Sequence, residues 1–358
     1  MNIDVDSHFT PPEIFDNIPL EYDDAPRWVT GNDGKRALWV KSVERWIRFD
    51  KSSYDLKMRM DAMKEGGYDK QCLNSALHTI PIPYVSPKTE LYLVKAWNDA
   101  VAKIVQENDC FIGVAQLPHR DVDAAIEEAD RAVKDLGFSA LHIEGNWAGK
   151  NIESYEWWPF FEKIEKLGVP IFSHPTGNAS EYYFNPNMPA KAQLELLPGD
   201  VSQLFAFLVL HQISMTGLIF LGVLDRFPGL KFVWLETEVG WVPGFMDLLD
   251  SYYDAHLFCK AQGILKYLQC KCPVESIALK KKPSQYFRDN FYVTTSGMFW
   301  EPPLKFVCSV LGSDKVLFAA DYPYESNKLA VEFIEAASLS ASDKANVCHR
   351  NAERILRL

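Results

Sequence analysis

The chain has 358 residues, 47% of them apolar and 13% aromatic, which is enough to fill a large core and excludes a disordered protein. Its formal net charge of -11 argues against binding to nucleic acid or to an anionic membrane. We therefore expect its partners to be small molecules or a second copy of the chain.

The cysteines, the first residues and the apolar runs indicate in which cellular compartment we expect the protein. Seven scattered cysteines favour reduced thiols and a cytoplasmic protein over a disulfide framework. The first residues are acidic where a secretory signal needs a basic region, so we expect no such signal. The longest apolar run, residues 204–224, is interrupted by His211 and Ser214, so we expect no membrane span.

Short β-rich apolar runs alternate with longer helical stretches along the chain. The helical stretches include residues 121–136 and 157–167, and the second stops at Gly168 before a strand begins. No G-x-G-x-x-G motif follows the first strand, which disfavours an open dinucleotide-binding sheet. Eight strand–helix units favour an α/β fold, a single (β/α)8 TIM barrel over residues 1–358. The expected strands are residues 2–6, 70–74, 110–116, 139–144, 169–174, 230–236, 290–296 and 316–321.

Two insertions interrupt this alternation. Residues 9–68 follow the first strand and are rich in tryptophan, and a turn at residues 31–34 joins two candidate short strands. We expect this insertion to form a lid over the barrel mouth or an interface between copies. The second insertion covers roughly residues 252–288 and ends near the lysine run 280–282, which is typical of a solvated face.

Polar side chains stand where the expected strands end, which is where TIM barrels build their active sites. The first strand ends in Asp6-Ser7-His8, the fifth in His174 and the eighth in Asp321. Residues two apart in an extended segment point the same way, so Asp6 and His8 should project together. Singly, each residue is more typical of a cap, a turn or a core histidine. Together they favour a divalent metal site with an open coordination position.

Six segments in a fixed order suggest a family. They are DVDSH (residues 4–8), VPIFSHP (169–175), GVLDRFPGLK (222–231), NFYVTTSG (290–297), LFAADYP (317–323) and RNAER (350–354). In these segments, and over nearly its whole length, the chain resembles the amidohydrolase-related (amidohydrolase 2) family. This family includes aminocarboxymuconate semialdehyde decarboxylase and the γ-resorcylate and dihydroxybenzoate decarboxylases.

The resemblance implies a TIM barrel that holds one divalent metal ion through Asp6, His8, His174 and Asp321. Asp6 would stand where better-known members have a histidine or glutamate. The ion would be Zn²⁺ or Mn²⁺, with Fe²⁺ as a further option, and no organic cofactor is expected. Barrels of this family are often dimers, so we expect a homodimer.

One residue departs from the family pattern. After the sixth strand the decarboxylases usually present a histidine that works as an acid and base, whereas this chain has Glu236. The glutamate version, together with the opening DVDSHFTPPEIFD, resembles a branch of metal hydrolases. The C-terminal third, with TTSGMFW and FAADYPYES, resembles the aromatic-acid decarboxylases.

Three functions follow from these features. The first is metal-dependent, non-oxidative decarboxylation of a hydroxylated aromatic or related unsaturated carboxylic acid. The second is metal-dependent hydrolysis of an amide, ester, thioester or lactone, and the third is ligand binding without catalysis. The substrate would be a small carboxylic acid or acyl compound.

Several residues are candidates for catalysis and substrate binding. The resemblance implies that Asp321 transfers a proton. Glu236 is expected to act as a second acid and base, or as an extra ligand that admits a second metal ion. His211 is a third catalytic candidate, although its place in a long helix is typical of a core or supporting histidine. The candidate substrate contacts are His78, Asn146 and Phe299. The alternatives are a loop cap for His78 and packing for Phe299.

Overall fold

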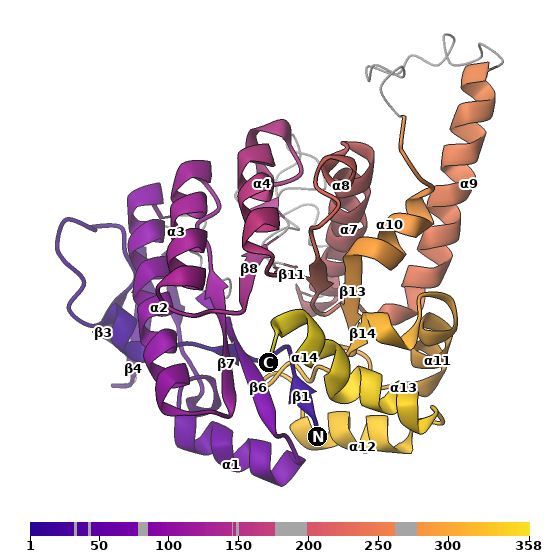
Figure 1. The fold of residues 1–358 in the computed structure, drawn as a ribbon. Coiled ribbons are helices and arrows are strands. Elements are labelled where there is room, and N and C mark those ends of the chain that lie inside the picture. Colours follow the sequence, from indigo (N-terminus) through magenta and orange to yellow (C-terminus); the bar gives the residue numbers. More distant parts are fainter. Residues whose placement is uncertain are drawn as a thin grey trace.

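Parallel strands form the centre of the protein, and helices surround them (Figure 1). The computed structural model describes residues 1–31, 34–41, 44–77, 85–144, 146–147, 150–175, 199–261 and 278–358. The central strands are β1 (Ile3–Asp4), β2 (His8–Phe9), β6 (Lys70–Ser75), β7 (Phe111–Gln116), β8 (Ala140–Glu144), β11 (Ile171–His174), β12 (Phe232–Trp234), β13 (Phe291–Thr294) and β14 (Val316–Leu317).

The strand order is β1-β6-β7-β8-β11-β12-β13-β14, and β2 also pairs with β6. Further backbone hydrogen bonds join the residues that follow β1 to those that follow β14, so the first and last strands of this order are neighbours. The amide of Val5 donates to Phe318 O at 3.1 Å, and the amide of Asp321 donates to Asp6 O at 2.8 Å. The predicted parallel barrel is therefore confirmed, and each expected strand has its counterpart near the expected residues.

The first expected strand is split into β1 and β2 by its own side chains. The Asp4 carboxylate accepts the amide of Asp6 at 3.0 Å and the amide of Ala320 at 3.0 Å, so these amides do not pair with a neighbouring strand. Gln71 donates to the second oxygen of Asp4 at 2.8 Å. Burial raises the pKa of Asp4 to about 7. Asp4 thus holds the backbone below the barrel mouth.

The helices follow the strands in the expected alternation. They are α1 (Leu56–Gly66), α2 (Pro87–Glu107), α3 (Val122–Lys134), α4 (Trp158–Leu167), α7 (Gly199–Phe220), α8 (Val223–Arg226), α9 (Val242–Ala261), α10 (Pro283–Asn290), α11 (Glu301–Val310), α12 (Asn327–Ala336), α13 (Ala341–Ala345) and α14 (Asn351–Leu356). Asp55, Ser86 and Asp121 cap α1, α2 and α3 by accepting an amide of the first turn. The predicted stop of α4 at Gly168 is confirmed, since its φ of 66° is left-handed.

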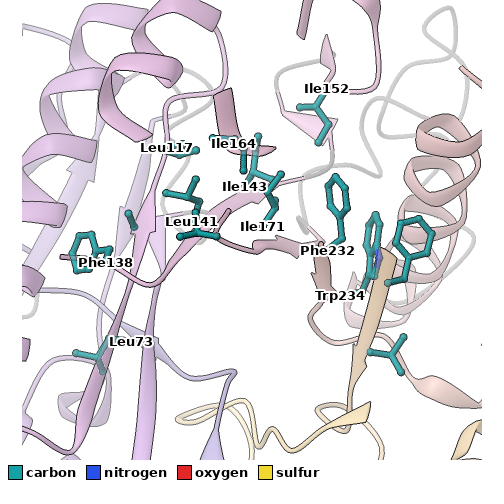
Figure 2. Close-up of a cluster of buried hydrophobic side chains, with 14 of the residues drawn as sticks. Leu73, Leu117, Phe138, Leu141, Ile143, Ile152, Ile164, Ile171, Phe232 and Trp234 are labelled. Carbon is teal, nitrogen blue, oxygen red and sulfur yellow. The ribbon is translucent and has the colours of Figure 1, made fainter. Parts of the chain in front are cut away.

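Alternate strand residues fill two cores. Val5, Cys72 and Val233 belong to the cluster inside the barrel, which α14 covers at one end through Ala352 and Leu356. The second cluster lies between the strands and the helices. Figure 2 shows part of it, with Leu141, Ile143, Ile171 and Phe232 from the strands and Ile164 from α4. Because these two cores pack on both sides of the strands, they fix the positions of the strand ends.

The two insertions contain regular structure. Residues 9–68 include α1 and a three-stranded antiparallel sheet, β3 (Arg27–Thr30), β4 (Arg36–Val40) and β5 (Arg45–Ile47). The two predicted strands around the turn are thus confirmed. The carboxylate of Asp24 accepts hydrogen bonds from Ser86 and Thr89 at the start of α2, which anchors the insertion beside the carboxyl ends of the strands.

Most of the second insertion lies in two helices or outside the described residues. Residues 252–261 continue α9, residues 283–288 belong to α10, and residues 262–277 lie outside the described part of the chain. Lys281 and Lys282 form ion pairs with Asp289 and Asp254. None of the described helices combines the length and the apolar character that a bilayer crossing requires.

Candidate metal centre

Four side chains that the sequence places at strand ends meet at one end of the barrel. Asp6 and His8 flank the start of β2, His174 ends β11, and Asp321 follows β14. Nε2 of His8 lies 3.7 Å from Oδ1 of Asp6 and 3.2 Å from Oδ1 of Asp321. The rings of His8 and His174 meet edge to face, with centroids 4.9 Å apart. The structure therefore brings together all four residues of the expected metal site.

Glu236, which follows β12, joins this cluster. Its Oε1 lies 2.8 Å from Nε2 of His174 and 3.7 Å from Nε2 of His8. The backbone φ is 48° at Glu236 and 66° at Asp321, a left-handed conformation that costs about 1 kcal/mol or more for such residues. Two overlapping groups have donor atoms within 4.8 Å of one another: Asp6, His8 and His174, and His8, Glu236 and Asp321.

The donor atoms fit a bound cation. Nδ1 of His174 faces the carbonyl oxygen of Pro175, and Nε2 faces the Glu236 carboxylate. Both oxygens are acceptors, and a neutral imidazole has only one N–H, so Nε2 needs a second proton or a cation. Oδ1 of Asp6 and Oδ1 of Asp321 accept no hydrogen bond of good geometry within the described ranges. Nitrogen and oxygen donors of this kind suit Zn²⁺, Mn²⁺ or Fe²⁺.

The pKa shifts within the cluster also favour a bound cation. Burial raises the pKa of Asp6, and burial with the charge of Glu236 raises the pKa of Asp321 well above its ordinary value. Burial acts to lower the pKa of His8, but contacts with Asp321 and Glu236 outweigh it and raise that pKa. Burial acts to raise the pKa of Glu236, but His174 and His8 lower it strongly. The raised pKa values of Asp6, Asp321 and His8 mean that the cluster favours bound protons when no metal ion is present. A bound divalent ion would supply the same positive charge.

Two supporting residues were missed by the sequence reasoning. Ser296 donates to Oδ2 of Asp6 at 2.7 Å and accepts the amide of Glu236 at 3.0 Å, so one hydroxyl orients both acids. Arg59 of α1 is fully buried and donates to Ser7 Oγ at 2.9 Å and to the carbonyl oxygen of His8. Ser296 lies within the quoted segment NFYVTTSG, which was a usable signal. Arg59 had no such signal.

Two of the remaining candidate residues, His211 and Phe299, contact residues outside the metal cluster. Nε2 of His211 lies 2.8 Å from the carbonyl oxygen of Leu235, and burial lowers the pKa of His211 to about 4. The ring of Phe299 packs against Phe333 of α12 with centroids 5.9 Å apart. These contacts fit the alternatives of a supporting histidine and of packing. His78 and the side chain of Asn146 lie outside the described part of the chain.

A second group of buried ionisable residues lies beside the cluster. The His142 ring lies 5.6 Å from the His174 ring, between centroids. Nε2 of His119 accepts the amide of Glu144 at 2.9 Å, so this histidine holds the backbone at the end of β8. Burial raises the pKa of Glu144 well above its ordinary value. These buried residues therefore lie next to the metal centre, at the end of β8.

Several curated relatives of the chain are named as decarboxylases. A γ-resorcylate decarboxylase from Polaromonas is 28% identical over 272 residues, which cover 73% of this chain and 75% of that protein. A 2-amino-3-carboxymuconate-6-semialdehyde decarboxylase from Dictyostelium discoideum is 26% identical over 322 residues, which cover 86% of this chain and 78% of that protein. The expected resemblance to these enzymes is confirmed.

Solved structures share the fold. A 5-carboxyvanillate decarboxylase from Novosphingobium aromaticivorans, crystallised with bound manganese, has a TM-score of 0.78 at 23% identity and covers 100% of this chain and 97% of its own. The likeness confirms the TIM-barrel architecture. The amidohydrolase family model (Amidohydro_2) matches residues 3–358. Since that match takes in nearly every residue, the chain belongs to the amidohydrolase family.

Proposed function

We propose that the protein is a metal-dependent carboxy-lyase that decarboxylates a hydroxylated aromatic or related unsaturated carboxylic acid without oxidation. The observation that carries the proposal is the convergence of Asp6, His8, His174 and Asp321 at the strand ends. The names of the two curated relatives described above support the choice of reaction, because both are decarboxylases of this substrate class.

Asp6, His8, His174 and Asp321 would hold one divalent ion. Manganese is supported by its presence in structural neighbours, and the donor set also accepts zinc or iron. When bound, the ion would supply the positive charge that attracts the substrate carboxylate and a neighbouring hydroxyl. We propose no organic cofactor.

The reaction needs a positioned proton. A proton adds to the carbon that bears the carboxylate, and an electron pair of the ring or double bond forms the new C–H bond. The C–C bond then breaks, its electron pair returns to the ring or double bond, and CO2 leaves. The balance is one carboxylate and one proton giving one arene or alkene and CO2, so the step requires no oxidant or reductant.

Asp321 is our candidate for the acid that delivers this proton, because its carboxyl group faces the metal centre, with Oδ1 3.2 Å from Nε2 of His8. Glu236 is our candidate for the group that resupplies the proton. His211 would act only through Leu235, whose carbonyl oxygen it contacts one residue before Glu236. Phe299, Asn146 and His78 remain proposed substrate contacts.

A hydrolase is the second candidate, and one contact favours it. Glu236 lies 2.8 Å from His174 at the metal centre, so its carboxylate is placed to accept a proton from an attacking water. The substrate would then be an amide, ester, thioester or lactone. In this case Glu236 would be the general base.

We also propose a cytoplasmic homodimer. The cysteines Cys72, Cys110, Cys308 and Cys348 are free thiols in the structure, which suits a reducing compartment. The acidic charge argues against nucleic acid and anionic membranes as partners. Sedimentation of the purified full chain tests the dimer directly.

A substrate panel separates the two reactions. The manganese-loaded full chain is incubated with hydroxybenzoates, with and without a second aromatic ring, and with amide, ester and lactone substrates, and CO2 and free acid are followed together. We expect CO2 from at least one hydroxylated aromatic acid and no hydrolysis. Acid release from acyl substrates without CO2 from any carboxylate would favour the hydrolase and reject the decarboxylase.

A further inference from the structure

A cavity of about 530 Å³ lies among α7, the 3-10 helix Val239–Trp241 and α11, and the proposed function does not use it. Its volume is in the range of pockets that bind drug-sized ligands. The residues that carry the argument are Leu208 of α7, Glu238, Trp241, Met298, and Trp300 and Phe306 at α11. We call this cavity the aromatic pocket.

Three chain segments pass from the metal centre into the wall of the aromatic pocket. Glu236 contacts His174, and Glu238 lies two residues further on. Ser296 contacts Asp6, and Met298 lies two residues further on. The aromatic pocket is therefore reached within two residues of the metal centre along the chain segments that follow β12 and β13.

The third segment belongs to α7. The ring of Phe207 lies 6.5 Å from the ring of His174, between centroids, and the next residue, Leu208, lines the aromatic pocket. The pocket is also held rigidly on its far side. A Cβ added to Gly240 would lie 3.1 Å from Cβ of Pro303, so the backbone of the 3-10 helix Val239–Trp241 packs tightly on α11.

The lining of the aromatic pocket is apolar except for one acid. Glu238 is the only charged residue among the described residues that line it. Its Cγ lies 3.7 Å from where a Cβ on Gly297 would be, so the side chain lies over the loop between the pocket and Ser296. Trp300 is 63% exposed and Phe306 is 49% exposed, so both rings present free faces at the entrance. Flat apolar groups pack well on such rings.

We propose that the aromatic pocket binds the part of the substrate remote from its carboxylate, an aromatic arm that ends in a hydroxyl or amine donor. The arm lies against Trp241, Trp300 and Phe306, and Glu238 accepts the hydrogen bond of the donor. The substrate is therefore larger than a one-ring hydroxybenzoate. This inference rests on the proposed function, because it places the carboxylate at the metal centre.

Binding of stable analogues tests the aromatic pocket without turnover. The probes are 2-nitrophenol, 4-(4-hydroxyphenyl)-2-nitrophenol and 4-(4-methoxyphenyl)-2-nitrophenol, in which the nitro group stands for the carboxylate. Isothermal titration calorimetry on the manganese-loaded full chain gives their dissociation constants. We expect the hydroxyphenyl arm to tighten binding at least tenfold over 2-nitrophenol, and the methoxy arm to bind at least about tenfold more weakly than the hydroxy arm.

Two variants and a control assign this gain to the aromatic pocket. Trp300→Ala should lose most of the gain from the arm, and Glu238→Leu should bind the hydroxy and methoxy arms equally. Tyr155→Ala removes another exposed ring, one that stacks on Trp158, and should leave all three constants unchanged. Both pocket variants change side chains that are at least partly accessible, and circular dichroism confirms that they fold.

The outcomes separate this inference from the proposed function. No gain from the arm in the wild type, or an equal loss for all three probes in Trp300→Ala, overturns the aromatic pocket as a substrate site. CO2 release is measured separately with the matching carboxylic acids. If those acids release CO2 but the arm adds no affinity, the decarboxylase stands and the pocket proposal fails. If the arm adds affinity and no acid releases CO2, the pocket stands as a binding site and the decarboxylase fails.

Discussion

Nε2 of His174 lies 2.8 Å from Oε1 of Glu236, so the imidazole that ends β11 is joined directly to the acid that follows β12. Nδ1 of the same ring faces the carbonyl oxygen of Pro175. The ring can satisfy both oxygens only with a cation or a proton at Nε2. Glu236 therefore occupies a position where it can either share a metal ion or exchange a proton.

Glu236→Gln tests the proton role. The amide keeps the size of the side chain but does not transfer a proton, so we expect turnover to fall by about 100-fold while metal content stays near that of the wild type. Steady-state rates and metal analysis are measured on the same sample. Glu353→Gln, which changes a surface acid paired with His349, is the control. An unchanged rate in Glu236→Gln would show that the residue is only structural.

Ser296→Ala tests the support of the metal ligands. Its hydroxyl donates to Asp6 and accepts the amide of Glu236, so its loss frees both acids to move. Such supporting contacts typically change metal affinity by about 10- to 100-fold. We expect a loss in this range in competition with a chelator. Ser309→Ala, on α11, should bind metal like the wild type, and equal affinity for both variants would contradict the role of Ser296.

Arg59→Met tests the buried guanidinium beneath the centre. The change leaves Ser7 Oγ, Gln71 Oε1 and His8 O without a donor inside the barrel wall. We expect the free energy of unfolding to fall by about 3 kcal/mol or more. Urea denaturation measures it. Lys57→Met breaks an exposed ion pair on the same helix and should leave the free energy of unfolding nearly unchanged; a similarly small effect for Arg59→Met would contradict this account.

Glu153→Gln tests a pH dependence away from the metal centre. Glu153 is buried beside Gly217 of α7, and burial raises its pKa from 4.5 to about 7. The folded state thus holds a proton that the unfolded state releases above pH 4.5. Its contribution to stability is fully present below that pH and is lost as pH rises through about 7, by up to about 3 kcal/mol.

Glu153→Gln should therefore gain stability relative to the wild type as pH rises from about 5 to about 8. Thermal unfolding of both proteins at several pH values measures the difference. A difference that does not change with pH would show that the pKa of Glu153 is not raised in the folded protein.

The fold was predictable because its signals are local. Strand–helix alternation and the stop at Gly168 are properties of short windows, and the structure reproduces them. The grouping of Asp6, His8, His174 and Asp321 was also predictable, because parallel strands carry their carboxyl ends to one face. The split of the first strand was not, since it depends on where the Asp4 carboxylate meets Ala320 across the barrel.

Contacts between distant segments limited the prediction of the site. Arg59 reaches Ser7 from α1, and only the folded barrel brings the two together. His211 is in the same position, because its contact with Leu235 depends on how α7 packs against β12. The aromatic pocket needs three separate segments, and of these the sequence singled out only TTSGMFW, which contains Met298 and Trp300. Side chains that act through such contacts are visible only in three dimensions.

The most direct test of the metal-dependent decarboxylase is a joint measurement of metal content and CO2 release in wild type, His174→Ala and the surface control His349→Ala. Mass spectrometry counts the bound divalent ions in each protein. We predict that the wild type and His349→Ala bind one ion per chain and release CO2 from a hydroxylated aromatic acid, and that His174→Ala loses most of both. Wild-type metal content and rate in His174→Ala, or full activity of the wild type after chelation, would contradict the account.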